Sequence, residues 1–286
     1  MKYLAASAYS VSFIQLVSLI GTLFGLFTYN LNISHILLIL LGYFLYSGIG
    51  ISLMMHRFFT HRSFEFKSKT VENICTWISV VSGRGSPIGW VYVHRLHHAF
   101  SDTDKDPHDP KRYSWRIFFP HMLNYGETVD KRLIKDLFNH KHLKINKYYN
   151  FYILVYWLLL LSVSVEFFIF FYCIPMFLSA LALDLFVYLS HSYGYRNHDT
   201  RDNSKNNWFI SLILWGEGWH NNHHAQTIRS LAGFKAARGR ALTWAARHGE
   251  RFADHGRLYS ARAAESARHD VRGSNVAADH QKFSHE

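Results

Sequence analysis

Four long apolar stretches dominate the pattern of hydrophobic and polar positions along the chain. They cover about residues 11–29, 33–55, 147–165 and 167–189. A helix that crosses the roughly 30 Å hydrocarbon core of a bilayer needs about 20 apolar residues, because each residue adds about 1.5 Å. Buried helices of water-soluble proteins rarely run for that length without a charge. The pattern therefore predicts four transmembrane helices arranged as two hairpins, the third of them with an interfacial start.

Positive charges are distributed unevenly between the segments that join these stretches. Residues 57–147 contain sixteen Lys and Arg, whereas the links near residues 30–32 and 166 contain none. The positive-inside rule then predicts that both termini and the long middle segment face the cytoplasm. This asymmetry accounts for much of the net charge of +11, and cations beside a membrane face anionic lipid headgroups, so we expect membrane lipid and no nucleic acid as partner. The apolar residues 71–82 are too few to span and predict an interfacial helix.

Histidine is concentrated in three short boxes with the sequences HRFFTH, HRLHH and HNNHH, and one further histidine follows the fourth apolar stretch. On a helix, residues three and four positions apart share a face, so the histidines of a box can converge on one site. Neutral imidazole binds iron, copper and zinc, and nine histidines are too many for one ion but suit two. The predicted ligands are His56, His61, His94, His97, His98, His191, His220, His223 and His224.

The boxes and their flanks carry a family resemblance. The strings HRFFTHRSFEF, GWVYVHRLHHAFSDTDKDPHDP, LSHSYGYRNHDTRDNSKNNW and WGEGWHNNHH, between about Leu37 and His224, resemble the membrane-bound fatty acid desaturases of the acyl-CoA/acyl-lipid type. The resemblance implies an all-α integral membrane protein, with four transmembrane helices in two hairpins and a cytoplasmic helical cap. It also implies that the same nine histidines hold two iron ions, and that O₂ is used to remove two hydrogens from a long-chain acyl group.

Two positions depart from the acyl-CoA enzymes of animals. Val187 stands four residues before His191, where those enzymes are expected to have Asn. Tyr92 and Val93 stand where those enzymes have an Arg-Asp pair before the second box. Both departures weaken the case for a CoA-linked substrate, and SPIGWVYVHRLHH is similar to bacterial enzymes, some of which act on acyl groups esterified in lipid. The substrate is therefore expected to be a lipid-linked or CoA-linked acyl group, with the position of the double bond open.

Residues near the boxes are candidates for supporting the site. Asp184 lies inside the fourth apolar stretch, about two turns before His191, and an intramembrane carboxylate is a functional suspect that could orient this histidine. His108 and the four aspartates of SDTDKDPHDP could do the same for other histidines, although a solvated, turn-rich loop explains them equally well. Trp90 lies one helical turn before the second box and is expected to line a tunnel for the acyl chain.

The proposed chemistry needs an oxidant and a source of electrons. An unactivated methylene has no acidic proton, so the two iron ions and O₂ must supply the oxidant. The sequence contains no Gly-rich dinucleotide fingerprint or cysteine cluster, so we expect a separate ferredoxin, cytochrome or reductase as electron donor. Two alternatives remain: a lipid or alkane hydroxylase or ketolase with the same site, and a non-enzymatic, histidine-rich metal transporter. A transporter would place its ligands near mid-membrane, unlike these boxes.

The composition changes after His224. Residues 1–224 form the expected desaturase domain, whereas residues 225–286 contain fourteen Ala, nine Arg and one Ile. A frameshifted or fused end explains this composition, and so does a basic, partly disordered tail. An altered tail also leaves open an inactive family member. We predict that removal of Gly239–Glu286 changes stability and activity little, because the segment has few large apolar side chains to bury.

Overall fold

The computed structural model describes residues 2–123 and 129–226 of the chain. In these ranges the protein is all-helical, and its only extended pairing is a pair of isolated bridges. The described residues belong to the first of two compact units, Met1–Gly233. The Arg/Ala-rich segment from residue 227 onward, and with it the predicted effect of truncation, lies outside the described residues.

The first two apolar stretches form a helical hairpin. Helix α1 runs from Lys2 to Thr28, and the second helix consists of α2 (Ile33–Tyr43) followed by the π-helical segment η1 (Phe44–Thr60). Asn32 begins α2, because its side chain accepts a hydrogen bond from a backbone N–H in the first turn. The ranges Ala8–Thr28 and Ile33–Thr60 are both long and apolar enough to cross a membrane.

The second hairpin contains one helix of spanning length and one shorter helix. Helix α8 (Val165–Phe168), the π-helical η5 (Ile169–Cys173) and α9 (Ile174–Ser190) continue as one apolar helix, the third candidate span. Helix α7 (Tyr149–Val163) has 15 residues, which corresponds to about 22 Å and is shorter than the hydrocarbon core. It is short because the chain is extended at Ser164. Three spans are therefore present by length, and a fourth stays a prediction.

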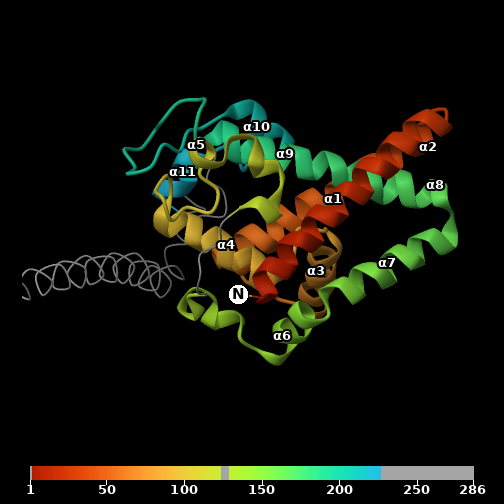
Figure 1. The fold of residues 1–286 in the computed structure, drawn as a ribbon, viewed down its shortest axis with the longest axis horizontal. Helices are drawn as coiled ribbons and strands as arrows, with labels where there is room; N and C mark the ends of the chain where they lie inside the picture. The colour runs from red at the N-terminus through yellow and green to blue at the C-terminus, as the bar shows by residue number, and fades with distance from the viewer. Residues whose placement is uncertain (1, 124–128, 227–286) are drawn as a thin grey trace, which may run out of the picture. The chain divides into compact units, whose positions relative to one another are not determined.

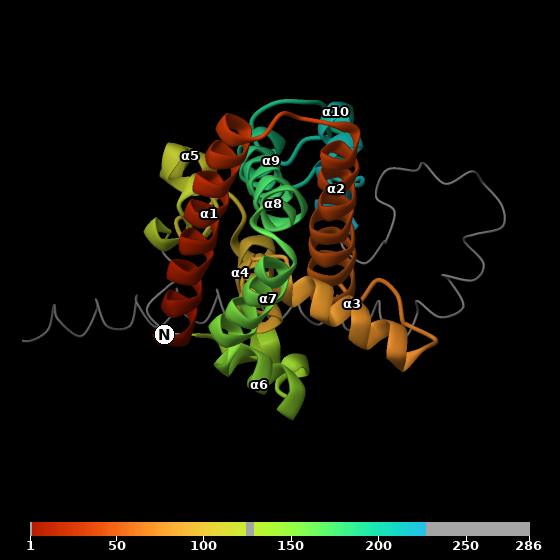
Figure 2. The ribbon, with the colours of Figure 1, turned by 90° about the vertical axis from the view of Figure 1, so that its right-hand side faces the viewer.

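Small residues allow the two hairpins to pack closely. A Cβ atom on Gly42 would lie only 2.3 Å from the backbone oxygen of Phe171, so this crossing requires glycine. Where the two hairpin turns meet, Nε2 of His35 lies 2.6 Å from Oε1 of Glu166, and the His35 ring stacks on Phe170. Figure 2 shows α8 and α9 between α1 and α2, both of which contact α9. The spans therefore form one packed bundle.

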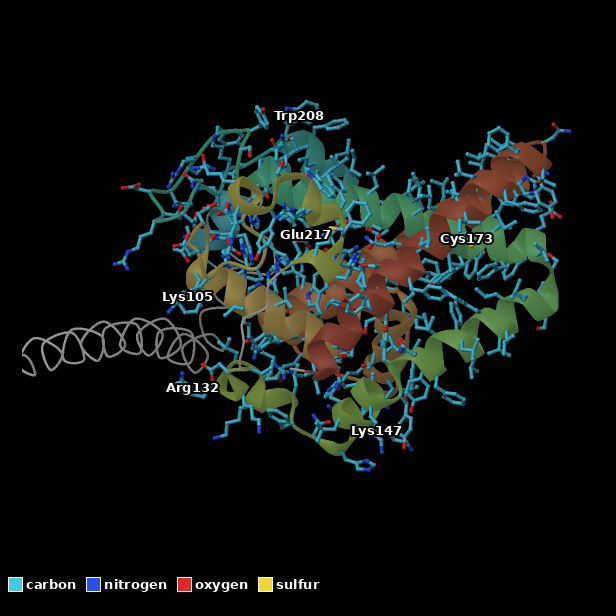
Figure 3. All side chains as sticks on the ribbon, in the orientation of Figure 1. Lys105, Arg132, Lys147, Cys173, Trp208 and Glu217 are labelled. Atoms are coloured by element: carbon cyan, nitrogen blue, oxygen red, sulfur yellow. The ribbon has the colours of Figure 1, made fainter. Side chains whose placement is uncertain are left out.

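The remaining helices gather at one end of the bundle. Figure 1 shows the α1–α2 and α7–α8 turns at one end of the molecule and α4, α5 and α11 toward the other. In Figure 3, Lys105, Arg132 and Lys147 lie away from the turn end, as the uneven charge distribution predicts. The elements outside the two hairpins are α3 (Lys69–Val81), α4 (Pro87–Phe100), α5 (Pro110–Tyr113), η2 (Ser114–Phe118), η3 (Pro120–Met122), η4 (Lys131–Leu137), α6 (His140–Lys147), α10 (Trp208–Ile213) and α11 (His220–Ala225).

Candidate metal centre

The structure brings the nine histidines of the boxes and their surroundings together in two groups. In each group, one nitrogen atom per residue lies within 4.8 Å of the corresponding nitrogen atoms of all the others. We call them the five-histidine group and the four-histidine group. The five-histidine group consists of His56, His61, His94, His98 and His223. The four-histidine group consists of His97, His191, His220 and His224.

The helical spacing of two boxes divides their members between the groups. Helix α4 begins with Pro87 and is capped by Ser86, whose side chain accepts a hydrogen bond from a backbone N–H of the first turn. Its residues His94 and His98, four apart, join the five-histidine group, whereas His97 points to the other group. Each residue rotates the helix by about 100°, so positions three and four apart diverge by about 100° as well. Helix α11 has the same spacing. Its residues His220 and His224, four apart, join the four-histidine group, whereas His223 joins the five-histidine group.

The imidazole nitrogens within each group are separated by the distances that a shared metal ion imposes. An imidazole–metal bond of about 2.0–2.1 Å, with angles of about 90–110°, places neighbouring donor atoms about 2.8–3.4 Å apart. The observed separations between Nε2 atoms are 3.2 Å for His61 and His94, 3.1 Å for His94 and His98, 3.0 Å for His98 and His223, 3.1 Å for His56 and His223, and 3.0 Å for His191 and His220.

Carboxylates lie against the opposite ring nitrogen, Nδ1, of four of these histidines. A carboxylate that accepts a hydrogen bond from Nδ1–H fixes the tautomer and leaves the lone pair of Nε2 directed into the group. Nε2 of His224 is buried and has no hydrogen-bond partner in the described part of the chain. Facing lone pairs repel each other unless a cation lies between them, so the residues fit metal ions. The carboxylate contacts are Glu217 to His56 at 2.5 Å, Asp106 to His97 at 2.9 Å, Asp102 to His191 at 3.2 Å, and Asp202 to His224 at 2.8 Å.

Burial favours the neutral, metal-binding form of these imidazoles. Desolvation, reinforced by neighbouring histidines, lowers the pKa well below the ordinary 6.5 for His61, His94, His98, His220 and His223. The pKa of His224 falls to about 4, because desolvation outweighs the opposing effect of Asp202. At neutral pH these rings are therefore uncharged and can donate a lone pair to a metal ion.

Asp184 has a different place from the one expected. Its Oδ1 accepts a hydrogen bond from Nη2 of Arg84 at 2.7 Å, and its Oδ2 accepts one from Nε2 of Gln15 at 3.0 Å. The carboxylate that contacts His191 is that of Asp102. Spacing along the sequence suggested Asp184 because it lies on the same helix, whereas the loop that follows α4 brings Asp102 to the ring from outside.

His108 and Trp90 both lie close to the histidine groups. The ring of His108 lies 5.8 Å from that of His97, and its backbone N–H donates to Asp106, but it belongs to neither group. The Trp90 ring is parallel to that of His94, with centroids 6.2 Å apart. Both side chains line the same pocket, so each contacts the space beside the groups rather than a histidine nitrogen.

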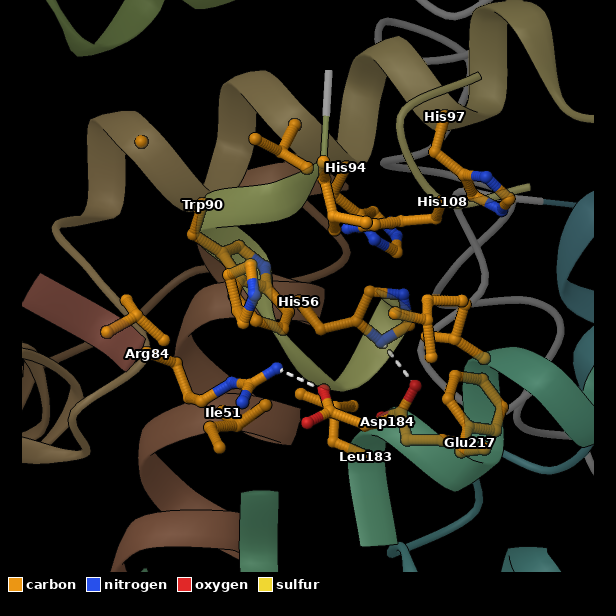
Figure 4. A pocket seen from close by; sticks show the side chains of 18 of the residues that line it. Ile51, His56, Arg84, Trp90, His94, His97, His108, Leu183, Asp184 and Glu217 are labelled. Atoms are coloured by element: carbon orange, nitrogen blue, oxygen red, sulfur yellow. Dashed lines mark hydrogen bonds and ion pairs between the residues drawn. The ribbon is translucent and has the colours of Figure 1, made fainter. Parts of the chain in front are cut away.

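This pocket opens directly beside both histidine groups (Figure 4). Its wall includes rings from each group and an apolar lining from several elements, among them Val11 of α1, Ile51 of η1, Ile117 of η2 and Phe186 of α9. An apolar chain placed there would lie against the candidate metal centre and in contact with these apolar side chains. The arrangement suits a reaction on a hydrocarbon rather than on a charged group.

Sequence reasoning missed two of the carboxylates. Glu217 lies three residues before His220, and its side chain also contacts Ser52 and Arg57. Asp202 lies in the loop before α10. A carboxylate immediately before a histidine box was the available signal for Glu217, whereas nothing in the sequence pairs Asp202 with a ring 22 positions away.

Comparison with known proteins agrees with this geometry. The family described as fatty acid desaturase matches residues 18–262. The sn-1 stearoyl-lipid 9-desaturase of Anabaena variabilis is 33% identical over 213 residues, covering 72% of this chain and 77% of the relative. A protein of the same description from Synechocystis sp. is 33% identical over 235 residues, with coverages of 78% and 70%. The icosanoyl-CoA 5-desaturase of Limnanthes douglasii is 35% identical over 198 residues, with coverages of 65% and 54%. The chain belongs to the fatty acid desaturase family.

Proposed function

We propose that this fatty acid desaturase holds one iron ion in each histidine group and uses O₂ to desaturate an acyl chain linked to membrane lipid. A –CH₂–CH₂– unit, O₂, two electrons and two protons give –CH=CH– and two molecules of water. The observation that carries the proposal is the pair of adjacent, all-histidine groups whose Nε2 atoms converge beside an apolar pocket.

The donor set supports two ions of a first-row metal such as iron. Imidazole suits iron, copper and zinc, while a structural zinc site usually has four ligands and often includes cysteine. One group has five histidines and the other four, so each leaves room for a further ligand. Both cysteines, Cys75 and Cys173, are free and stand apart from the groups. Bound iron would supply with O₂ the oxidant that an unactivated methylene needs.

The protein itself orients the ligands and places the chain. Asp106 accepts a hydrogen bond from Nδ1 of His97, and Glu217 lies against Nδ1 of His56, so that the other ring nitrogen of each histidine stays available. The apolar pocket wall displaces water from the acyl chain that it contacts and fixes how far this chain reaches past the two groups, which determines the carbons that lie nearest the metals. Position and exclusion of water are therefore the contributions of this chain, whereas oxidation belongs to the cofactor.

A lipid-linked substrate is supported by the second box. Tyr92 is buried, and Val93 lines the pocket, so neither side chain offers a cation to a CoA headgroup. The relatives from Anabaena variabilis and Synechocystis sp. are named stearoyl-lipid desaturases. The remaining parts of the proposal are α7 as a fourth span, the histidine groups on the cytoplasmic side, and electrons from a separate ferredoxin, cytochrome or reductase.

Metal and product analysis test the proposal together. Protein purified from iron-replete cells should contain about two irons per chain, and cells that express it with an electron donor should gain monounsaturated acyl groups in their lipids. His97→Ala should lose the product and about one of the two irons, whereas His140→Ala, at an exposed histidine of α6 outside both groups, should lose neither. Zinc in place of iron would contradict the metal assignment, and hydroxylated acids would contradict the reaction.

A further inference from the structure

A charged pair is buried in the pocket wall, apart from the carboxylates that contact histidines. Arg84 Nη2 donates to Asp184 Oδ1 at 2.7 Å, and the side chains are only 9% and 6% exposed. Both residues line the pocket. Burying two charges costs more than their attraction commonly returns, and hydrophobic residues of similar volume often stabilise a protein as well or better. The pair therefore calls for a role other than stability.

The backbone around Arg84 fixes the position of its guanidinium group. Arg84 lies in the turn between α3 and α4, flanked by Gly83 at φ 71° and Gly85 at φ 95°. A Cβ on Gly83 would lie 2.9 Å from Cγ2 of Ile14 and 3.3 Å from the hydroxyl of Tyr172. The turn is thus inserted between spanning helices in a conformation that needs glycine. It brings a cation to a defined place within the apolar bundle.

Hydrogen-bond donors outnumber acceptors at this place. Both oxygens of Asp184 are occupied, by Arg84 and by Gln15. Nη1 of Arg84 and Nε1 of Trp90 are buried, and neither has a hydrogen-bond partner among the described residues. Figure 4 shows Arg84 and Trp90 on the same side of the pocket, with His97 on the opposite side. Buried donors without partners are rare in native proteins, and a ligand that brings an acceptor would satisfy them.

The chemistry of the ligand follows from this balance. Asp184 already neutralises Arg84, so a carboxylate or phosphate would leave an uncompensated charge in apolar surroundings. A carbonyl oxygen carries no charge and only accepts hydrogen bonds. We propose that Arg84 and Trp90 form a carbonyl-binding subsite in the pocket, for the carbonyl of an acyl ester or for a ketone within the chain. The inference rests on the proposed function, because the pocket must hold an acyl chain.

Binding of three C18 probes to the detergent-solubilised, iron-loaded protein tests the subsite. The probes are methyl stearate, octadecan-9-one and octadecane, which carry the carbonyl at the end, in the middle or nowhere. The wild type should bind at least one carbonyl probe about tenfold more tightly than octadecane, as hydrogen bonds to a charged donor allow. The probe that binds more tightly identifies whether the ester or an in-chain ketone is the source of the oxygen.

Two conservative variants and one control complete the test. Trp90→Phe removes the indole N–H and keeps a ring, and Arg84→Lys keeps a cation for Asp184 but loses the second guanidinium nitrogen. Both should bring the preference for carbonyl probes close to one. Trp157→Phe removes an equally buried indole N–H in α7, packed against Phe168 and Tyr172, and should keep the preference.

The outcomes separate the subsite from the proposed function. Equal affinity of the wild type for all three probes overturns the subsite, and so does a preference that survives in both variants. Iron content and desaturation of cellular lipid are measured on the same preparations. If they are absent, the proposed function fails. If they are normal and the carbonyl preference is missing, only the subsite fails.

Discussion

Replacing Asp106 with Asn should weaken metal binding in the four-histidine group. The side chain of Asp106 is surrounded by donors. Oδ1 accepts from Nδ1 of His97 at 2.9 Å and from the backbone N–H of His108 at 2.8 Å, while Oδ2 accepts from the same ring nitrogen at 3.0 Å and from the N–H of Asp102 at 2.8 Å. Whichever way an amide is turned, its NH₂ group faces a donor. The substitution therefore changes hydrogen bonding without changing size.

The magnitude follows from the burial of this contact. The Asp106 side chain is 0% exposed, so water does not replace a lost acceptor. Burial raises the pKa of Asp106, but its interaction with His97 and the hydrogen bond from the backbone N–H of His108 lower this pKa by more, so the carboxylate is ionised at neutral pH. Loss of a carboxylate partner of a metal-binding histidine typically lowers metal affinity about 10–100-fold, or about 1.4–2.8 kcal/mol. The NH₂ group of the introduced Asn would face two hydrogen-bond donors, and this should also destabilise the metal-free fold by about 1–3 kcal/mol.

Competition with a chelator measures the change. The matched control is Asp136→Asn, because Asp136 accepts hydrogen bonds from Arg62 and Arg95 in place of a histidine. Asp106→Asn should release one of the two metal ions at about 10–100-fold lower chelator concentration, while the control releases both as the wild type does. Equal retention of both metals by the two variants would refute the role assigned to Asp106.

Three further predictions concern the separation of the groups, pH and packing. His220→Ala should reduce iron from about two per chain to about one by metal analysis, and a loss of both would contradict independent groups. The pKa of His224 (about 4) and that of His108 (about 3) lie below the unfolded value of 6.5, mainly through desolvation, so the unfolded chain binds more protons below that pH. Metal-free protein should therefore have a lower Tm at pH 5.5 than at pH 7.5, and a rise would contradict this sign. Gly42→Ala should lower the Tm because its Cβ would collide with the backbone of Phe171, and an unchanged Tm would show that the hairpins can move apart.

The positions of the histidines could be predicted because their spacing is a local property of the chain. The split of a box between two groups could not, since it depends on α11 meeting α4 in a particular register. His97 joins His220 rather than His94, its neighbour on the same helix. Which ring each carboxylate contacts is less predictable still, because Asp102 and Asp202 reach His191 and His224 from loops whose paths no periodicity describes.

The apolar pattern predicted the hairpins better than their ends. The helix expected to finish at residue 55 continues to Thr60, so His56 lies within it. The end of an apolar stretch does not have to be the end of the helix, because polar side chains in the last turns of the helix are tolerated at the membrane surface. The helix expected over residues 147–165 begins at Tyr149 and ends at Val163, because Ser164 adopts an extended conformation and caps α8.

The order in which the histidines are synthesised affects which metal ion can bind them first. Four members of the five-histidine group precede residue 99, whereas its last member, His223, follows more than a hundred residues later. At about 5–20 residues per second, the stretch from His98 to His223 takes roughly 6–25 seconds to synthesise. During that time a four-imidazole fragment exists without His223. Such a fragment binds copper or zinc more tightly than ferrous iron, following the general order of divalent affinities. Loading with the proposed iron ions therefore depends on how scarce the competing metals are around the nascent chain.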